Sequence, residues 1–176
     1  MNTSLIFSAA CPGEIQIPIE VIGFEDISTF ELYMETPDNI SFVGFENSNI
    51  SNIMVEENGG IVSVYYDGDA VNLDGVHLID LVFYVESEFA GEVFDIIWIE
   101  NDCHYYSDNG EVSSNYEDGQ ISAELLPGDA INIIGIDSIC IGTAGIVYET
   151  TEIENAVTYI WSLEPENAGE ITSNEL

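Results

Sequence analysis

The chain has 176 residues, of which 34 are Asp or Glu and none is Lys or Arg, so its formal charge at pH 7 is −34. This charge excludes nucleic acids and anionic membranes as partners, because no basic side chain is available to neutralise phosphate. It favours divalent cations or basic proteins instead. Apolar residues make up 46% of the chain, which is enough for a core and excludes an acidic disordered tail.

Two amphipathic strands are predicted near the start of the chain. Apolar and polar residues alternate over residues 14–21, and again over residues 29–35 after a turn at residues 23–26. A period of two is typical of strands with one buried face. Two such strands need a second sheet to cover them. The residues expected in this core are Ile17, Ile19, Phe30 and Leu32.

Turn signals divide the following residues into further strands. Asn58-Gly59-Gly60 is typical of a hairpin turn. Residues 76–85 and 92–100 are rich in β-branched and aromatic residues, and Trp98 in the second run is expected in the core. No window has a helical period. Eight or nine strands before residue 125 therefore predict an all-β, antiparallel β-sandwich.

A second segment is predicted after the linker Leu-Leu-Pro-Gly at residues 125–128. Residues 129–176 contain four short apolar runs that we interpret as strands, with Trp161 of the third run in a core. Four strands cannot close an immunoglobulin-like sandwich, which needs about seven. The sequence therefore predicts an incomplete domain after a first domain at residues 1–124.

Several motifs follow one another in a specific order within residues 4–124. They are PGEIQIPIEVIGFEDISTFELYM, FVGFEN, ENGGIVSVYYDGDAV, HLIDLVFYV and IIWIENDCHYYSDNG, followed by YEDGQI. Together they resemble a cohesin domain of large secreted bacterial surface proteins. The tail SICIGTAGIVYETTEIENAVTYIWSLEPENAGEI resembles the first half of a PKD-like immunoglobulin-type domain. The resemblance implies a jelly-roll sandwich, an extracellular location and a binding or structural role, but identifies no dockerin-contact residues.

Three cysteines, Cys11, Cys103 and Cys140, lack the spacing of zinc ligands. Cys11 precedes the first core strand, and Cys103 follows the strand that contains Trp98. We therefore predict a disulfide between Cys11 and Cys103, of the kind found in oxidising compartments. Cys140 is then left over, and its partner is expected either outside this sequence or on another chain.

Two groups of acidic residues are candidate calcium ligands, because calcium takes six to eight oxygens in such loops. The first group is Asp67, Asp69 and Asp74, which lie among glycines. The second group is Asp102, Asp108, Asn109, Glu111 and Asp118. The alternative interpretation is that they are solvated turn residues, since Asp-Gly and Asn-Gly are ordinary in hairpins.

No catalytic signature is recognisable: the sequence lacks a GxSxG elbow, a GxGxxG loop and a P-loop. His77 and His104 lie in strand contexts and are expected on strand faces rather than as catalytic bases. Tyrosines at 65–66, 105–106 and 116 are a candidate sugar platform, although tyrosines on strands more often pack half-buried. We expect no enzyme activity.

Two functional hypotheses follow. The first is an extracellular structural protein that polymerises head to tail into a fibre or surface layer, with a neighbour's strand completing residues 129–176. The expected donor is the apolar N-terminal segment 2–10, with Leu5, Ile6 and Phe7, and calcium or salt would screen the repulsion. A piece of a longer adhesin would have the same sequence. The second hypothesis is a binding module that recognises a dockerin or a glycan.

Overall fold

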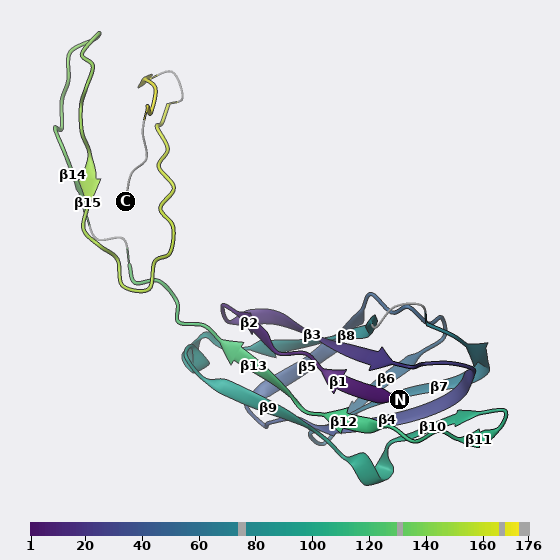
Figure 1. The fold of residues 1–176 in the computed structure, drawn as a ribbon. Coiled ribbons are helices and arrows are strands. Elements are labelled where there is room, and N and C mark those ends of the chain that lie inside the picture. Colours follow the sequence, from purple (N-terminus) through teal and green to yellow (C-terminus); the bar gives the residue numbers. More distant parts are fainter. Residues whose placement is uncertain (74–76, 130–131, 166–167, 173–176) are drawn as a thin grey trace. The chain divides into compact units, whose positions relative to one another are not determined.

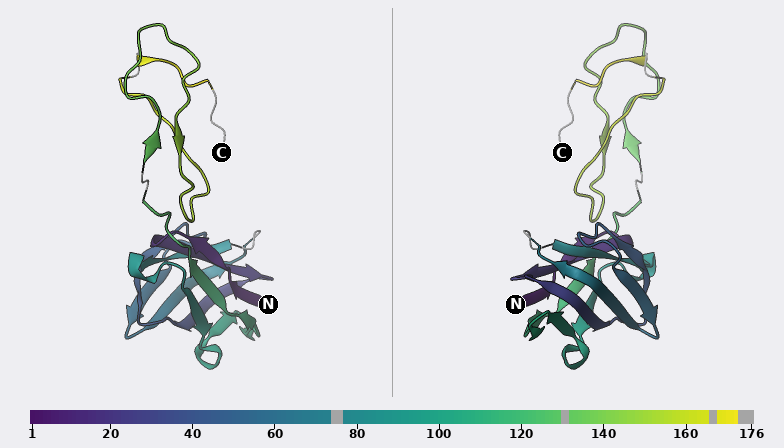
Figure 2. Two further views of the ribbon diagram at one scale, coloured as in Figure 1. Left: turned by 90° about the vertical axis from the view of Figure 1, so that its left-hand side faces the viewer. Right: turned by 90° about the vertical axis from the view of Figure 1, so that its right-hand side faces the viewer.

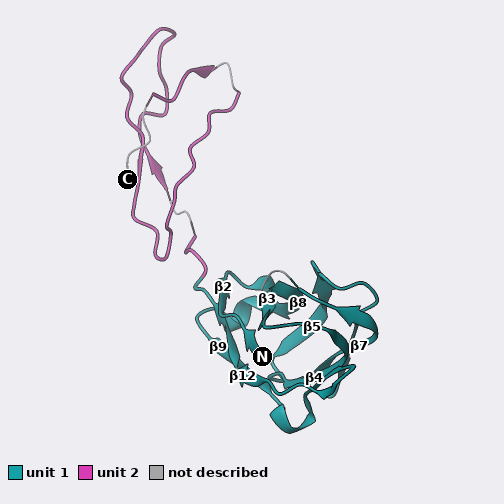
Figure 3. Ribbon diagram, turned by 45° about the vertical axis from the view of Figure 1, so that its right-hand side comes forward, with its two compact units in different colours: residues 1–125 teal, residues 126–176 magenta. Residues whose placement is uncertain are grey.

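The computed structural model of the chain describes residues 1–73, 77–129, 132–165 and 168–172. Two compact units are present, residues 1–125 and residues 126–176 (Figure 3). The division falls within the segment 125–128 that was predicted as a linker. Among the described residues, no helix is long and apolar enough to cross a membrane.

The first unit consists almost entirely of strands (Figure 1). They are β1 (Asn2–Leu5), β2 (Ser8–Ala10), β3 (Gly13–Ile22), β4 (Ile27–Glu35), β5 (Ile40–Glu46), β6 (Met54–Asn58), β7 (Ile61–Val71), β8 (His77–Val85), β9 (Val93–Trp98), β10 (His104–Ser107), β11 (Gly110–Glu111), β12 (Asn115–Glu117) and β13 (Gly119–Ala123). Two single-turn 3₁₀ helices, η1 (Ser87–Phe89) and η2 (Glu100–Asp102), interrupt them. The predicted all-β class is confirmed.

The strands form two sheets that face each other (Figure 2). The five-stranded sheet has the order β12-β1-β3-β8-β5. The eight-stranded sheet has the order β11-β10-β4-β9-β13-β2, and β7 and β6 extend it from β4. The pairs β1–β12 and β2–β13 are parallel, and the other pairs within these two sheets are antiparallel. The structure is therefore the β-sandwich that the sequence predicts.

The core lies between the two sheets and is formed by alternate residues of the long strands. Ile17 and Ile19 of β3 face Phe30 and Leu32 of β4, and all four side chains are fully buried. Trp98 of β9 is also buried. The hairpin between β6 and β7 turns at Gly59 and Gly60, whose φ angles are +61° and +80°. Positive φ at both positions is the conformation that a two-residue type I′ turn requires.

The N-terminal segment belongs to this sandwich. β1 lies between β12 and β3, and β2 pairs with β13 of the other sheet. Both hydrogen-bonding edges of β1 are therefore occupied, and the backbone N–H of Ile6 donates to the Pro18 carbonyl at 3.0 Å. The prediction that Leu5, Ile6 and Phe7 form a donor strand for a neighbouring molecule is wrong, because the chain uses this segment in its own fold.

A buried hydroxyl fastens the N-terminal strand to the opposite sheet. Thr3 of β1 has no exposed surface, and its hydroxyl hydrogen-bonds the hydroxyl of Tyr105 in β10 at 3.0 Å. It also hydrogen-bonds the hydroxyl of Ser114 at 3.0 Å. Tyr105 is itself fully buried, and burial raises its pKa far above the ordinary value. The Tyr105 phenol therefore stays protonated and depends on Thr3 as its partner.

The second unit contains little regular structure. Its described strands are β14 (Ile133–Ile134) and β15 (Glu149–Thr150), which pair with each other. Trp161 is half-buried and lies in no strand, and part of the fourth predicted strand lies outside the described residues. Among the described residues of this unit, the predicted immunoglobulin-type arrangement is not seen. Large apolar side chains are exposed here at Ile133, Ile134, Ile136, Ile139, Ile141, Val147, Tyr148, Val157, Ile160, Leu163 and Ile171.

We predict that Thr3→Val lowers the free energy of unfolding by about 1–3 kcal/mol, because the Tyr105 hydroxyl would be left buried without a partner. The double variant Thr3→Val/Tyr105→Phe should recover part of this loss, since it removes both polar groups. Urea unfolding of the full chain, followed by circular dichroism, measures both effects. Additive losses in the double variant would show that the hydroxyl pair does not fasten β1.

Candidate functional site

The structure leaves all three cysteines free. The thiol of Cys103 is buried beside β4, where it accepts the backbone N–H of Tyr33 at 3.2 Å and donates to the Tyr33 carbonyl at 3.4 Å. Cys11 is exposed in the turn between β2 and β3. The predicted Cys11–Cys103 disulfide is therefore wrong in this structure. Burial raises the pKa of the Cys103 thiol to about 11, so this group is a poor nucleophile at neutral pH.

The predicted calcium ligands are engaged in separate contacts. Asp67 accepts the Thr29 hydroxyl at 3.3 Å, Glu111 contacts the His104 Nδ1 at 2.9 Å, and Asp118 accepts a backbone N–H. Asp69 lies on β7, Asp102 in η2, and Asp108 and Asn109 in the turn before β11, whereas Asp74 lies outside the described residues. In the part of the chain that the structure describes, no group of three or more His, Cys, Asp or Glu side chains is placed to hold a metal. Calcium binding stays a prediction.

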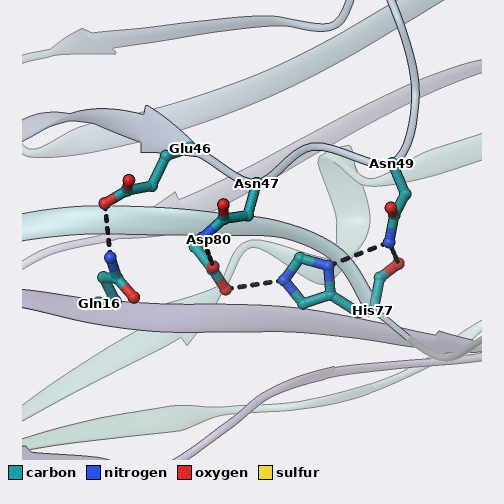
Figure 4. Close-up of polar contacts among 6 residues, drawn as sticks. All are labelled: Gln16, Glu46, Asn47, Asn49, His77 and Asp80. Atoms are coloured by element: carbon teal, nitrogen blue, oxygen red, sulfur yellow. Dashed lines mark hydrogen bonds and ion pairs between the residues drawn. The ribbon is translucent and has the colours of Figure 1, made fainter.

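A network of polar side chains lies on the outer face of the five-stranded sheet (Figure 4). At its centre is Asp80 of β8, which is only 7% exposed. Its Oδ1 lies 2.8 Å from the His77 Nε2, and its Oδ2 accepts the Asn47 side-chain amide at 2.7 Å. The Asn49 amide donates to the His77 carbonyl at 2.9 Å and lies 3.2 Å from the His77 Nδ1. Each of these groups thus has its partners within the network.

The contacts of His77 fit the tautomer of the neutral ring that carries its proton on Nε2. In this tautomer Nε2 donates to Asp80 and Nδ1 accepts from the Asn49 amide. Among the described residues, no hydroxyl or thiol hydrogen-bonds His77; its partners are Asn49 and Asp80. The network fastens the loop after β5 to β8.

The outer face of the eight-stranded sheet is different, because it gathers aromatic and aliphatic side chains among carboxylates. The strand register places Met54, Tyr65, Glu31 and His104 in one row across β6, β7, β4 and β10. The other rows contain Glu56, Ser63 and Tyr33, and then Asn58, Ile61, Glu35 and Ile97. We call this surface of β6, β7, β4, β9 and β10 the tyrosine face.

Contacts within the tyrosine face fix its aromatic rings. The rings of Tyr33 and Tyr65 meet edge to face with centroids 5.7 Å apart. A side-chain hydrogen bond with Tyr65, together with desolvation and the nearby Glu31 carboxylate, raises the pKa of Tyr33 to about 12. Met54 is 57% exposed and Ile97 is 45% exposed. Rigid aromatic rings beside accessible apolar groups are typical of protein-binding surfaces.

Three carboxylates of the tyrosine face, those of Glu31, Glu35 and Glu56, make no hydrogen bond to other described residues. With no Lys or Arg in the chain, they are available to a cationic partner. The tyrosine platform predicted from residues 65–66, 105–106 and 116 is divided by the fold, because Tyr66 and Tyr105 are buried. The alternation of apolar and polar residues in the sequence indicates that Tyr33 and Tyr65 point outward. It does not indicate that their strands, β4 and β7, are neighbours in the sheet.

The fold is similar to that of solved cohesin structures. The third cohesin ScaC of Acetivibrio cellulolyticus, in complex with the ScaB dockerin, is 16% identical with a TM-score of 0.62; the match covers 70% of this chain and 98% of that chain. A type I cohesin–dockerin complex from Clostridium thermocellum is 14% identical with a TM-score of 0.62, and the match covers 69% of this chain and 97% of that chain. The non-cellulosomal cohesin of the archaeon Archaeoglobus fulgidus is 14% identical with a TM-score of 0.52, and the match covers 69% of this chain and 90% of that chain.

No family model matches this chain, and no curated protein matches its sequence. At these identities the likeness shows the fold alone. The resemblance to a cohesin domain is confirmed at that level for the first unit, and the matches do not show the PKD-like second domain.

We predict that iodoacetamide at pH 8 labels Cys11 and Cys140 in the native protein, while Cys103 reacts only after denaturation. A pKa near 11 leaves about a thousandth of the Cys103 thiol ionised at that pH, and the side chain is buried. Mass spectrometry of labelled peptides, prepared without reductant, measures each site. A Cys11 that resists labelling even in denaturant would instead support the disulfide.

Proposed function

We propose that the first unit is a non-catalytic protein-binding module that takes a dockerin-type partner through the tyrosine face. The single observation that carries this proposal is the tyrosine face itself, with exposed apolar groups, fixed tyrosine rings and unpaired carboxylates. The fold supports it, because cohesins with this fold are in complex with dockerins in the matched structures.

The contrast between the two outer sheet faces favours the eight-stranded sheet as the binding surface. On the five-stranded sheet, the Gln16 amide donates to Glu46 and the Asp80 carboxylate is held by His77 and Asn47. Because both oxygens of the buried Asp80 carboxylate already have partners, this group gains little from a second protein. The tyrosine face offers accessible methionine and tyrosine side chains, which are enriched at the centres of interfaces.

The charge of the chain defines the chemistry of the partner. Because every charged side chain other than the histidines is acidic, a dockerin-type partner would place Lys or Arg opposite Glu31, Glu35 and Glu56. Complementary charge of this kind accelerates association and disfavours acidic competitors. An extracellular location, which the cohesin resemblance implies, belongs to this proposal.

The cohesin likeness supports a binding module rather than a fibre subunit. The fibre hypothesis required a free N-terminal donor strand, and β1 and β2 are both paired inside the first unit. Glycan recognition is the remaining alternative of the binding class. The Tyr33 and Tyr65 rings meet at 84° and do not present one flat stacking surface, so the proposal is a protein partner.

The test is a binding screen of the full chain against a panel of dockerins by calorimetry. Tyr65→Ser should weaken binding at least about tenfold, in keeping with the loss of a central aromatic contact. The matched control is Tyr84→Ser on the five-stranded sheet, where Tyr84 is 40% exposed, and its affinity should equal that of the wild type. An effect of Tyr84→Ser alone would place the site on the other sheet, and failure of every dockerin to bind would reject the dockerin class.

We also predict that added salt weakens this binding mainly by slowing association, because screening shortens the reach of the acidic face. Surface plasmon resonance over a series of NaCl concentrations measures the two rate constants. Glu31→Gln should reduce the dependence of the association rate on salt. An association rate that does not change with salt would contradict charge complementarity as the basis of recognition.

A further inference from the structure

A hollow in the surface lies at the margin of the tyrosine face, where the chain crosses from β1 to β2 past β9 and β13. It is open and shallow, with a volume of about 450 Å³, and it is lined by Leu5, Phe7, Asp95, Ile97, Asp118 and Gln120. Ile97 belongs both to this hollow and to the tyrosine face, so the two surfaces are continuous.

The wall of the hollow is apolar and accessible, and its floor is closely packed. Phe7 is 58% exposed, although large apolar side chains are usually withdrawn from water. Gly119 lies at the floor, where an added methyl group would collide with Leu5 and come within 2.9 Å of the Ile17 Cδ1. Close packing of this kind gives the hollow a preformed shape, which reduces the cost of binding.

Two carboxylates at the hollow are held in place by uncharged donors. The Gln120 side-chain amide donates to the Asp95 Oδ1 at 2.6 Å, and the backbone N–H of Trp98 donates to the Asp118 Oδ1 at 2.8 Å. Each contact uses one oxygen, and within the described residues the second oxygen of each carboxylate accepts no hydrogen bond. With no Lys or Arg in the chain, a cation for these oxygens has to come from another molecule.

The apolar wall distinguishes an organic cation from a metal ion as the ligand. Calcium needs six to eight oxygen ligands, and two carboxylates beside Phe7 and Ile97 do not supply them. A lysine or arginine side chain has an apolar stem that packs on such a wall and a charged end that reaches carboxylates. The ring of Phe7 adds a favourable surface for the cation.

We propose that this hollow receives a lysine or arginine side chain of the protein partner. The inference rests on the proposed function for the identity of the partner, and it extends the binding surface from the tyrosine face across β9 to β13. The recognised group is a guanidinium or ammonium on an aliphatic stem.

The first test uses a probe that does not require the partner. N-acetyl-arginine amide is titrated into the isotope-labelled full chain and followed by NMR, with the neutral isostere N-acetyl-citrulline amide as control. We expect saturable shifts at the amides of Ile97 and Gln120 with the arginine probe only. Asp95→Asn should abolish them, whereas Asp69→Asn, which removes one exposed charge on β7, should not.

Equal shifts with the citrulline probe, or an arginine response that Asp95→Asn leaves unchanged, would overturn the proposal. Phe7→Ser provides a second variant that removes the wall without changing charge, and it should weaken the arginine response. Because Phe7 is exposed, this variant does not depend on the folding of the core.

The second test separates this proposal from the proposed function. Against a dockerin that binds the wild type, Asp95→Asn should weaken affinity by about tenfold more than Asp69→Asn, a difference of about 1.4 kcal/mol. Equal affinities of the two variants would overturn the role of the hollow while leaving the binding module intact. Binding of the arginine probe in the hollow without binding of any dockerin would support the cation site and reject the dockerin class.

Discussion

Apart from the contacts of two histidines, the carboxylates of this protein have to be solvated or hydrogen-bonded by uncharged groups, because the chain has no Lys or Arg. The structure meets this constraint with amide and backbone donors: Asn47 donates to Asp80, Gln16 to Glu46 and the Trp98 backbone to Asp118. Hydrogen bonds to an ionised acceptor are stronger than neutral ones, so a few such donors fix the carboxylates that lie against the sheets. The carboxylate oxygens without a donor remain in water, and these are the ones that a cationic partner can reach.

Strand pattern predicted the parts of the fold in which one strand face is buried. Apolar and polar residues alternate over residues 14–21 of β3 and 29–35 of β4, and the type I′ turn at Gly59-Gly60 defines its own hairpin. The sequence could not show which edge the short strand β1 would pair with, because a terminal strand of four residues suits a donor strand and an internal strand equally well. The disulfide prediction is wrong for a related reason. The order of residues along the chain does not show that the Cys103 thiol hydrogen-bonds the Tyr33 backbone.

The two outer sheet faces differ in how their polar groups are satisfied, and this difference is the reason for assigning the proposed binding surface to the tyrosine face. The His77–Asp80–Asn47 network needs no external partner, so it adds order to the loop after β5. On the tyrosine face, the carboxylates of Glu31, Glu35 and Glu56 are separated by tyrosine, methionine and isoleucine side chains. A partner that desolvates this face has to supply both apolar surface and cations, and specificity follows from the requirement for both.

The same charge makes a partner of opposite sign more plausible than a second copy of the chain. Two molecules of charge −34 repel each other over the screening length of the solution, about 8 Å at physiological ionic strength. A homopolymer would have to overcome this repulsion at every contact, whereas the negative charge of the chain attracts a basic partner during encounter. The sequence hypothesis of a fibre recognised this cost and invoked calcium or salt to offset it. With β1 and β2 paired within the first unit, the strand exchange that would have compensated for the repulsion is also lost, so charge and topology both favour recognition of a different molecule.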